Sequence, residues 1–259
     1  MRFHNRLLPV VTFTGSSLMV GCGGNSGSCS YGSSYGSSAG CAAPLVTGDG
    51  YYEGTLISPG AAQGTPVVAI IAENGDGAIS AQDGTYYRLN VSLPQNNVSG
   101  TFYGISQGAN FPNGSKATSG SISATATASG LSGTLSVQTA AETLSLSFDT
   151  VYNLSSSLAT LAGPWSYTAN GFSLSVTIRP DGTFSGMDSN NCSYTGAFTL
   201  IDPNFNAYSE SYARLCSSGV NVTFTGLATY FPSNGNTSPA EIKILADDNA
   251  SEFLVADLQ

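Results

Sequence analysis

The feature that most constrains the fold of this chain is a two-residue alternation of apolar and small polar side chains. In one segment Phe172, Leu174 and Val176 alternate with serine and threonine, and the same alternation recurs over 144–149 and 220–225. Successive side chains of a β-strand point to opposite faces, so each segment predicts a strand with one buried and one hydrated face. The chain is therefore expected to be all-β.

Turn sequences separate the alternating segments at short intervals. They are Asn74-Gly75-Asp76-Gly77, Asp83-Gly84, Asn113-Gly114, Asp181-Gly182, Asn234-Gly235 and Asp247-Asp248-Asn249. Asn, Asp and Gly tolerate the positive φ angles of tight hairpins. Short strands joined by such turns are typical of antiparallel sandwiches and barrels.

Two halves of the chain resemble each other. Gly50-Tyr51-Tyr52 opens the first and Gly163-Pro164-Trp165 the second, and Asp76-Gly77 in the first half is echoed by Asp181-Gly182 in the second. Two small units fit the length better than one. We expect two tandem antiparallel meander β-barrel or sandwich units after a disordered tether, the alternative being one larger sheet shared by both halves.

The first residues have the plan of an export signal. Arg2 and Arg6 precede a mostly apolar run over 7–20, which is too short to span a bilayer. The segment Met19-Val20-Gly21-Cys22 then resembles the lipobox of bacterial lipoproteins. The resemblance implies that Cys22 is acylated and becomes the mature N-terminus, and Gly23 after it favours the outer membrane, on either face. The alternative is an ordinary secretory signal.

The expected organisation follows from these boundaries. It comprises a signal peptide (1–21), a Gly/Ser-rich tether (22–49), a first β unit (50–154), a connector (155–162) and a second β-barrel-like unit (163–259).

Charge and histidine content exclude several classes of function. Without residues 1–21 the chain keeps five basic and sixteen acidic residues, a net charge of −11. Such a surface repels phosphate backbones, so no nucleic-acid partner is expected. Export also removes His4, the one histidine. Ser-His-Asp triads and histidine-ligated metals are thereby excluded, and we expect neither a cofactor nor a metal site.

The cysteines predict two disulfides in an oxidising compartment. With Cys22 acylated, Cys29, Cys41, Cys192 and Cys216 remain, and they allow three pairings. Proximity in sequence favours Cys29–Cys41 and Cys192–Cys216. The second pair would join neighbouring strands of one hairpin.

The segment Gly163-Pro164-Trp165, opening a meander of strands, resembles the Gly-x-Trp start of lipocalin barrels. The resemblance implies a carrier with a ligand cavity, whereas short strands favour an interior filled by side chains, with Trp165 as a core aromatic residue. Four tyrosines could furnish a binding face, although packing within the barrel is the simpler interpretation. They are Tyr86, Tyr87, Tyr208 and Tyr212.

Catalysis is not expected from this residue content. Lys116 lies in a polar turn region, alternation points Lys243 into water, and most carboxylates lie in solvated turns. The sequence therefore favours a lipid-anchored envelope protein with a non-catalytic binding or structural role. Its partners would be the membrane, through the anchor, and an unidentified protein or small molecule. The alternatives are a lipocalin-like carrier of a small apolar ligand and, third, a carboxylate-dependent hydrolase.

Overall fold

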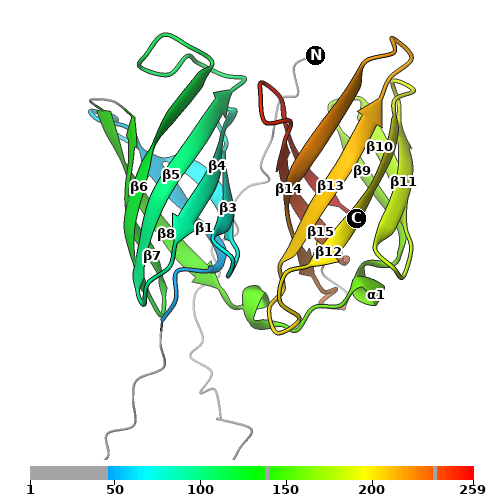
Figure 1. The fold of residues 1–259 in the computed structure, drawn as a ribbon, viewed down its shortest axis with the longest axis horizontal. Coiled ribbons are helices and arrows are strands. Elements are labelled where there is room, and N and C mark those ends of the chain that lie inside the picture. The colour runs from blue at the N-terminus through cyan, green and yellow to red at the C-terminus, as the bar shows by residue number, and fades with distance from the viewer. Residues whose placement is uncertain (1–45, 138–139, 236–237) are drawn as a thin grey trace, which may run out of the picture.

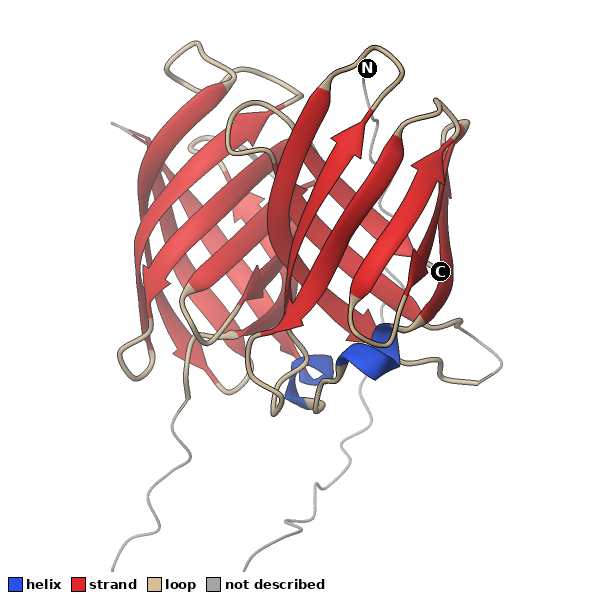
Figure 2. Cartoon of the chain, turned by 45° about the vertical axis from the view of Figure 1, so that its right-hand side comes forward, coloured by secondary structure: helices blue, strands red, loops and turns tan. Residues whose placement is uncertain are grey.

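The computed structural model describes residues 46–137, 140–235 and 238–259. Within these ranges the chain forms two antiparallel meanders of eight strands each, with almost no helix (Figures 1 and 2). The predicted all-β class with two tandem barrel-like units is confirmed, and the alternative of one shared sheet is wrong. The predicted signal and tether, with Cys22, Cys29 and Cys41, lie outside the described residues.

The strands of the first barrel are β1 (Gly50–Ile57), β2 (Thr65–Ile71), β3 (Asp76–Ala81), β4 (Thr85–Ser92), β5 (Asn97–Ser106), β6 (Ala117–Thr127), β7 (Gly130–Val137) and β8 (Ala140–Asp149). Those of the second are β9 (Gly163–Ala169), β10 (Phe172–Ile178), β11 (Thr183–Asp188), β12 (Ser193–Leu200), β13 (Tyr208–Leu215), β14 (Asn221–Phe231), β15 (Glu241–Asp247) and β16 (Phe253–Leu258). Between them lie a 3-10 turn, η1 (Thr150–Asn153), and a single helical turn, α1 (Leu158–Leu161).

The first barrel is closed by pairing of its first and last strands. β1 pairs with β8 from Tyr51↔Asp149 to Ile57↔Thr143. At Gly54 the two strands approach so closely that a Cβ atom would lie 2.1 Å from the carbonyl oxygen of Ser145. A glycine is therefore required there for the strands to meet.

The second barrel is closed at a single point. Ser166 on β9 and Gln259, just after β16, exchange two backbone hydrogen bonds of 2.7 and 2.8 Å. The other strands form a continuous sheet from β9 to β16. The two repeated segments lie at the same hairpin of each barrel but two residues out of step, because Asp76-Gly77 opens β3 whereas Asp181-Gly182 forms the turn before β11, as Asn74-Gly75 does before β3. The loop over 58–64 accounts for most of the extra length of the first half, since its counterpart is only the turn at 170–171.

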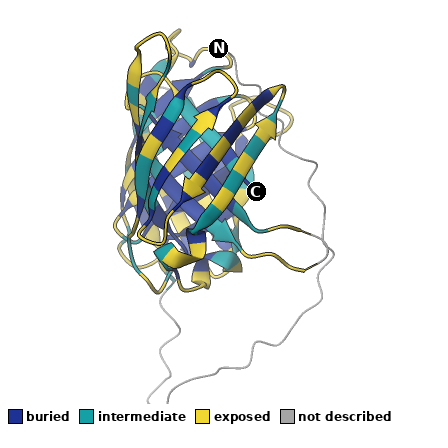
Figure 3. Cartoon of the chain, turned by 90° about the vertical axis from the view of Figure 1, so that its right-hand side faces the viewer, coloured by how far each residue is buried: buried dark blue, intermediate teal, exposed yellow. Residues whose placement is uncertain are grey.

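The interiors of the two barrels differ in polarity. The described residues that fill the middle of the first barrel are apolar, including Tyr87 and Phe102 on its strands and Phe111 in the loop between β5 and β6. The rings of Phe102 and Phe111 meet the ring of Tyr87 edge to face. The hydroxyl of Tyr87 donates to Glu142 at the rim of that barrel, at 2.9 Å. The second barrel has a similar apolar lining, but it also encloses carboxyl groups. Figure 3 shows the alternation of buried and exposed residues along its strands.

The barrels pack side by side through an apolar interface (Figure 1). Tyr51 and Phe231 meet edge to face at 5.0 Å between ring centroids, and Tyr86 stacks on Phe253 at 5.3 Å. Residues of β2 and β15 that point out of their own barrels are buried here, as Ile70 and Leu245 show. These strands are buried on both faces, which explains their nearly continuous apolar sequences.

Two charged residues are buried in the same interface. Asp247 is fully buried and forms an ion pair of 2.7 Å with Arg88 of the first barrel. Lys243 is 8% exposed and lies between Asp257 and Glu241, at 2.5 and 3.3 Å. The prediction that Lys243 points into water is therefore wrong. Alternation did direct it away from the interior of its own barrel, but the first barrel covers that outer face. Burial lowers the pKa of Lys243, yet the two carboxylates raise it by more.

Candidate functional site

A column of large side chains on β13 projects into the second barrel. Alternation places Tyr208, Glu210, Tyr212 and Arg214 on the inner face, while Ser211 between them is exposed. Tyr208 and Tyr212 belong to the apolar core. The column therefore runs from the core, through a carboxyl group, to a guanidinium near one end of the barrel.

Glu210 is an unpaired carboxyl group in this apolar interior. It is 3% exposed, and neither of its carboxyl oxygens has a hydrogen-bond partner. Its partners across the sheet are Phe198 and Gly226. Burial disfavours the charged form and raises the pKa of Glu210 to about 8. The hydroxyl of Tyr212 is likewise buried without a partner, and burial raises its pKa well above the usual value.

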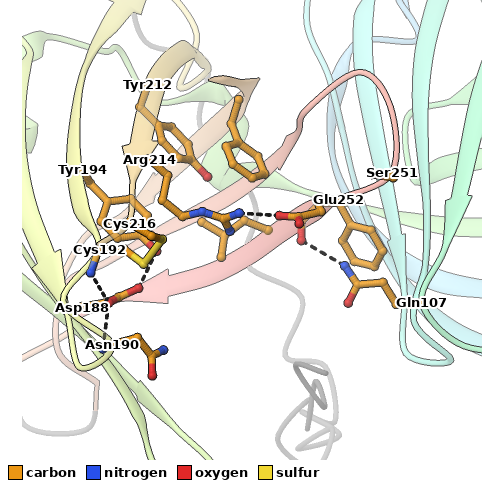
Figure 4. Close-up of a pocket in the computed structure, with 13 residues that line it drawn as sticks. Gln107, Asp188, Asn190, Cys192, Tyr194, Tyr212, Arg214, Cys216, Ser251 and Glu252 are labelled. Carbon is orange, nitrogen blue, oxygen red and sulfur yellow. Dashed lines mark hydrogen bonds and ion pairs between the residues drawn. A yellow bond between two sulfur atoms is a disulfide. The ribbon is translucent and has the colours of Figure 1, made fainter. Parts of the chain in front are cut away.

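A pocket of about 370 Å³ opens above this column, at one end of the second barrel. Figure 4 shows Arg214 and Glu252 pointing toward one another across it. Their ion pair is 2.6 Å long, and the guanidinium lies 5.1 Å from the centroid of the Phe224 ring. Burial lowers the pKa of Arg214, but the hydrogen bond and charge of Glu252 raise it by more. We call this space the mouth pocket.

Asp188 and a disulfide form the opposite wall of the mouth pocket (Figure 4). The Asp188 carboxyl accepts hydrogen bonds from the backbone N–H groups of Asn190 and Cys192, at 2.8 and 2.9 Å, and from the hydroxyl of Tyr194 at 2.9 Å. Cys192 and Cys216 form a disulfide with their Cα atoms 4.0 Å apart. The bridge follows the last residue pair of the β12–β13 hairpin, Ser193↔Leu215, as the sequence predicted.

The loop between β15 and β16, which carries Glu252, is held by both barrels. Asp248 accepts hydrogen bonds from three successive backbone N–H groups of the loop, including that of Glu252. From the first barrel, the hydroxyl of Tyr103 donates to the carbonyl of Ala250 at 3.0 Å, and Gln107 donates to the carbonyl of Phe253 at 3.3 Å. The first barrel thus positions one wall of the mouth pocket.

A small inner cavity lies deeper in the second barrel. It measures about 20 Å³ and is lined by apolar residues together with Glu210. Tyr194, Tyr212 and Leu254 line both this cavity and the mouth pocket, so the two spaces adjoin at these three side chains, which we call the neck. Glu210 also contributes to the lining of a groove of about 400 Å³ between the barrels.

The sequence predicted part of this arrangement. The disulfide was found, and Trp165, predicted as a core residue, is half-buried and packs against the core, with its indole N–H donating to the carbonyl of Leu161 at 2.7 Å. The four tyrosines considered for a binding face are all buried: Tyr86, Tyr87, Tyr208 and Tyr212. The expectation that carboxylates lie in solvated turns missed Glu210. The sequence does contain a sign that Glu210 is buried, because Glu210 alternates with Tyr208 and Tyr212 on one face of β13.

Among the described residues, no three His, Cys, Asp or Glu side chains come together in a group able to hold a metal ion. Over 46–137, 140–235 and 238–259, none of the helices is long and apolar enough to cross a membrane.

Comparison with known proteins adds little to this picture. No protein family matches the chain, and no curated protein sequence matches it. A crystal structure from Bacteroides fragilis, described as a "putative outer membrane protein", matches 82% of this chain and 96% of its own, with 13% identity and a TM-score of 0.30. A likeness at that TM-score supports no statement about the structure or location of this chain.

Proposed function

We propose that this chain is a non-catalytic binding protein of the bacterial envelope, anchored through an acylated Cys22, and that the mouth pocket of the second barrel is its binding site. The anchor rests on the lipobox-like sequence alone. The binding site rests on geometry. Small-molecule sites are concave and mostly apolar, with a few polar groups that fix the ligand, and pockets of 300–1,000 Å³ are typical.

The observation that carries the proposal is the contrast between the barrels. The first is filled by apolar side chains, whereas the second keeps two buried groups without partners, Glu210 and the hydroxyl of Tyr212, beneath an open pocket. An unsatisfied buried polar group destabilises the fold by about 1–3 kcal/mol. Such groups in one cavity are more economically explained by a ligand than by packing.

The geometry favours this proposal over the two alternatives. A carrier that encloses an apolar ligand needs a hollow barrel, and the inner cavity of about 20 Å³ holds little more than one water-sized group. A carboxylate-dependent hydrolase needs two carboxyl groups facing each other across a cleft. The carboxyl of Glu210 has no polar partner within hydrogen-bond distance, and it lies below the neck. The ligand is therefore held at the mouth, with only its end inside.

The test is a binding measurement with the mouth blocked. Three dansyl probes share one fluorophore and differ in the charge of their end group: dansylcadaverine (cationic), its N-acetyl derivative (neutral) and dansyl-aminocaproate (anionic). Ser251 lies exposed at the edge of the mouth pocket, so Ser251→Trp should weaken binding of at least one probe about tenfold or more by filling that space.

The matched control is Ser119→Trp, which adds the same side chain to the exposed face of β6 in the first barrel. It should leave the affinity unchanged. The proposed site is wrong if no probe binds the second barrel, or if both tryptophan variants bind every probe as the unmodified protein does.

A further inference from the structure

The groups around the mouth pocket include more carboxyl groups than cations. Asp188, Glu210 and Glu252 supply three carboxyl groups, whereas Arg214 is the one cationic side chain among the described residues that line the mouth pocket or inner cavity. Arg214 is already paired with Glu252 at 2.6 Å. Within the described part of the chain, Asp188 accepts hydrogen bonds from neutral N–H and O–H groups only, and no group donates a hydrogen bond to Glu210.

The walls of the pocket suit a cation as well. Tyr212 stacks on Phe224 at 5.0 Å between ring centroids, and Tyr194 lies 6.0 Å from Tyr212. Aromatic faces attract cations within about 6 Å of the ring centroid. The protein itself uses this property, because Arg214 lies over Phe224.

The inner cavity is the right size for the charged end of such a ligand. Its volume of about 20 Å³ accommodates one group the size of a water molecule. An ammonium group has that size. Only the neck side chains Tyr194, Tyr212 and Leu254 separate the inner cavity from the mouth pocket, where about 370 Å³ remains for an apolar body. The net charge of −11 without residues 1–21 would also draw cations toward the protein.

We infer that the ligand of the mouth pocket is a small organic amine, whose protonated end passes the neck to pair with Glu210 while its apolar body fills the mouth. This inference deepens the proposed function and depends on it. Glu210 is then a specificity residue: it selects a cation over a neutral or anionic compound of the same shape.

The test compares the affinities of the three dansyl probes for the unmodified protein and for two glutamate variants. Above about pH 8, where Glu210 is ionised in the folded protein, dansylcadaverine should bind at least about tenfold more tightly than its N-acetyl derivative, because an ammonium paired with a buried carboxylate contributes more than a neutral amide. Glu210→Gln keeps the shape and cannot ionise, so it should abolish that preference.

Glu53→Gln provides the charge-matched control. It removes one negative charge from the exposed face of β1 in the first barrel. The amide oxygen of the new glutamine can still accept a hydrogen bond from the hydroxyl of Tyr51. The preference for dansylcadaverine should survive in this variant. Far-UV circular dichroism and thermal unfolding of both variants verify that they are folded.

The outcomes separate the inference from the proposed function. If all three probes bind alike, are weakened by Ser251→Trp and are indifferent to Glu210→Gln, the pocket binds ligands but the amine assignment is wrong. If the preference for the cation persists in Glu210→Gln, or is lost equally in Glu53→Gln, the charge comes from elsewhere and the inference is overturned. If no probe responds to Ser251→Trp, the proposed site itself fails.

Discussion

Glu210 is the residue at which the second barrel departs from a filled apolar core. A glutamine would have filled the same space without a charge, and an apolar residue would have left no unsatisfied oxygen. Burial raises the pKa of Glu210 to about 8, so its proton is held more tightly in the folded than in the unfolded chain. Tyr212 and Tyr86 both have pKa values raised first by their own burial and then, in part, by the charge of Glu210.

The pKa of Glu210 predicts a pH-dependent stability. Below its unfolded pKa of about 4.3 the group is protonated in both states and contributes nothing. Between that value and about 8 the unfolded chain releases the proton while the folded chain keeps it, so the free energy of unfolding falls as the pH rises. Glu210→Gln should remove this loss and stabilise the protein by about 3 kcal/mol at neutral pH.

Urea unfolding of both proteins at several pH values between 4 and 9 measures the effect. The difference in the free energy of unfolding between variant and parent should be small at pH 4 and grow toward pH 8. A constant difference across this range would show that Glu210 ionises in the folded barrel as it does in water.

At the scale of elements, strands β2 and β15 join the two barrels. Each presents one face to its own interior and the other to the partner barrel. The interface is mostly apolar, and Asp247 is its most deeply buried charge. Breaking a buried ion pair is costly because the remaining charge is left in a medium that solvates it poorly.

Arg88→Ala should therefore destabilise the protein by about 2–4 kcal/mol, at the lower end for buried pairs because the Arg88 side chain is 35% exposed. Arg179→Ala, at an exposed position before the turn into β11, should cost less than about 0.5 kcal/mol. Replacing both partners, Arg88→Met with Asp247→Leu, should restore only part of the loss, because the backbone N–H of Asn249 loses its acceptor on Asp247. Equal effects of the two alanine variants in chemical denaturation would mean that the pair contributes nothing to the interface.

At the scale of the whole molecule, the second barrel carries the candidate site and the first supports it. Tyr103 and Gln107 hold the loop that forms one wall of the mouth pocket, and Phe253 stacks on Tyr86. In Figure 1 the red loop between β15 and β16, which carries Glu252, lies at the end of the barrels away from the connecting segment with α1. The two barrels therefore form one functional unit.

The proposed anchor makes a separate prediction for the whole protein. Acylation of Cys22 would place a lipid-modified cysteine at the N-terminus after removal of residues 1–21, and two or three acyl chains hold a protein on a membrane almost permanently. Mass spectrometry of the protein extracted from membranes should find the modified Cys22, and Cys22→Ser should abolish the modification. An unmodified mature N-terminus at another residue would contradict the anchor.

Local pattern was enough to predict the strands, the two units and the hairpin disulfide. Alternation and turn residues are local, and Cys192 and Cys216 end the two strands of one hairpin. The contacts between the barrels could not be predicted, because a side chain that alternates away from its own core can face either water or another barrel. Lys243 is an example, since it points away from its own core but is buried. Glu210 was missed for a related reason: alternation defines a face, but not whether a polar residue on it is enclosed.

The proposed binding site is tested most directly by locating a bound amine. Dansylcadaverine titrated into ¹⁵N-labelled protein should shift backbone amide signals around the mouth pocket, at Cys192, Arg214 and Phe253, and these shifts should weaken in Glu210→Gln. The groove between the barrels, lined by Gly77, Thr199 and other residues, should be unaffected. Shifts confined to that groove or to the outer faces of the strands, with the mouth signals unmoved, would contradict a binding site in the second barrel.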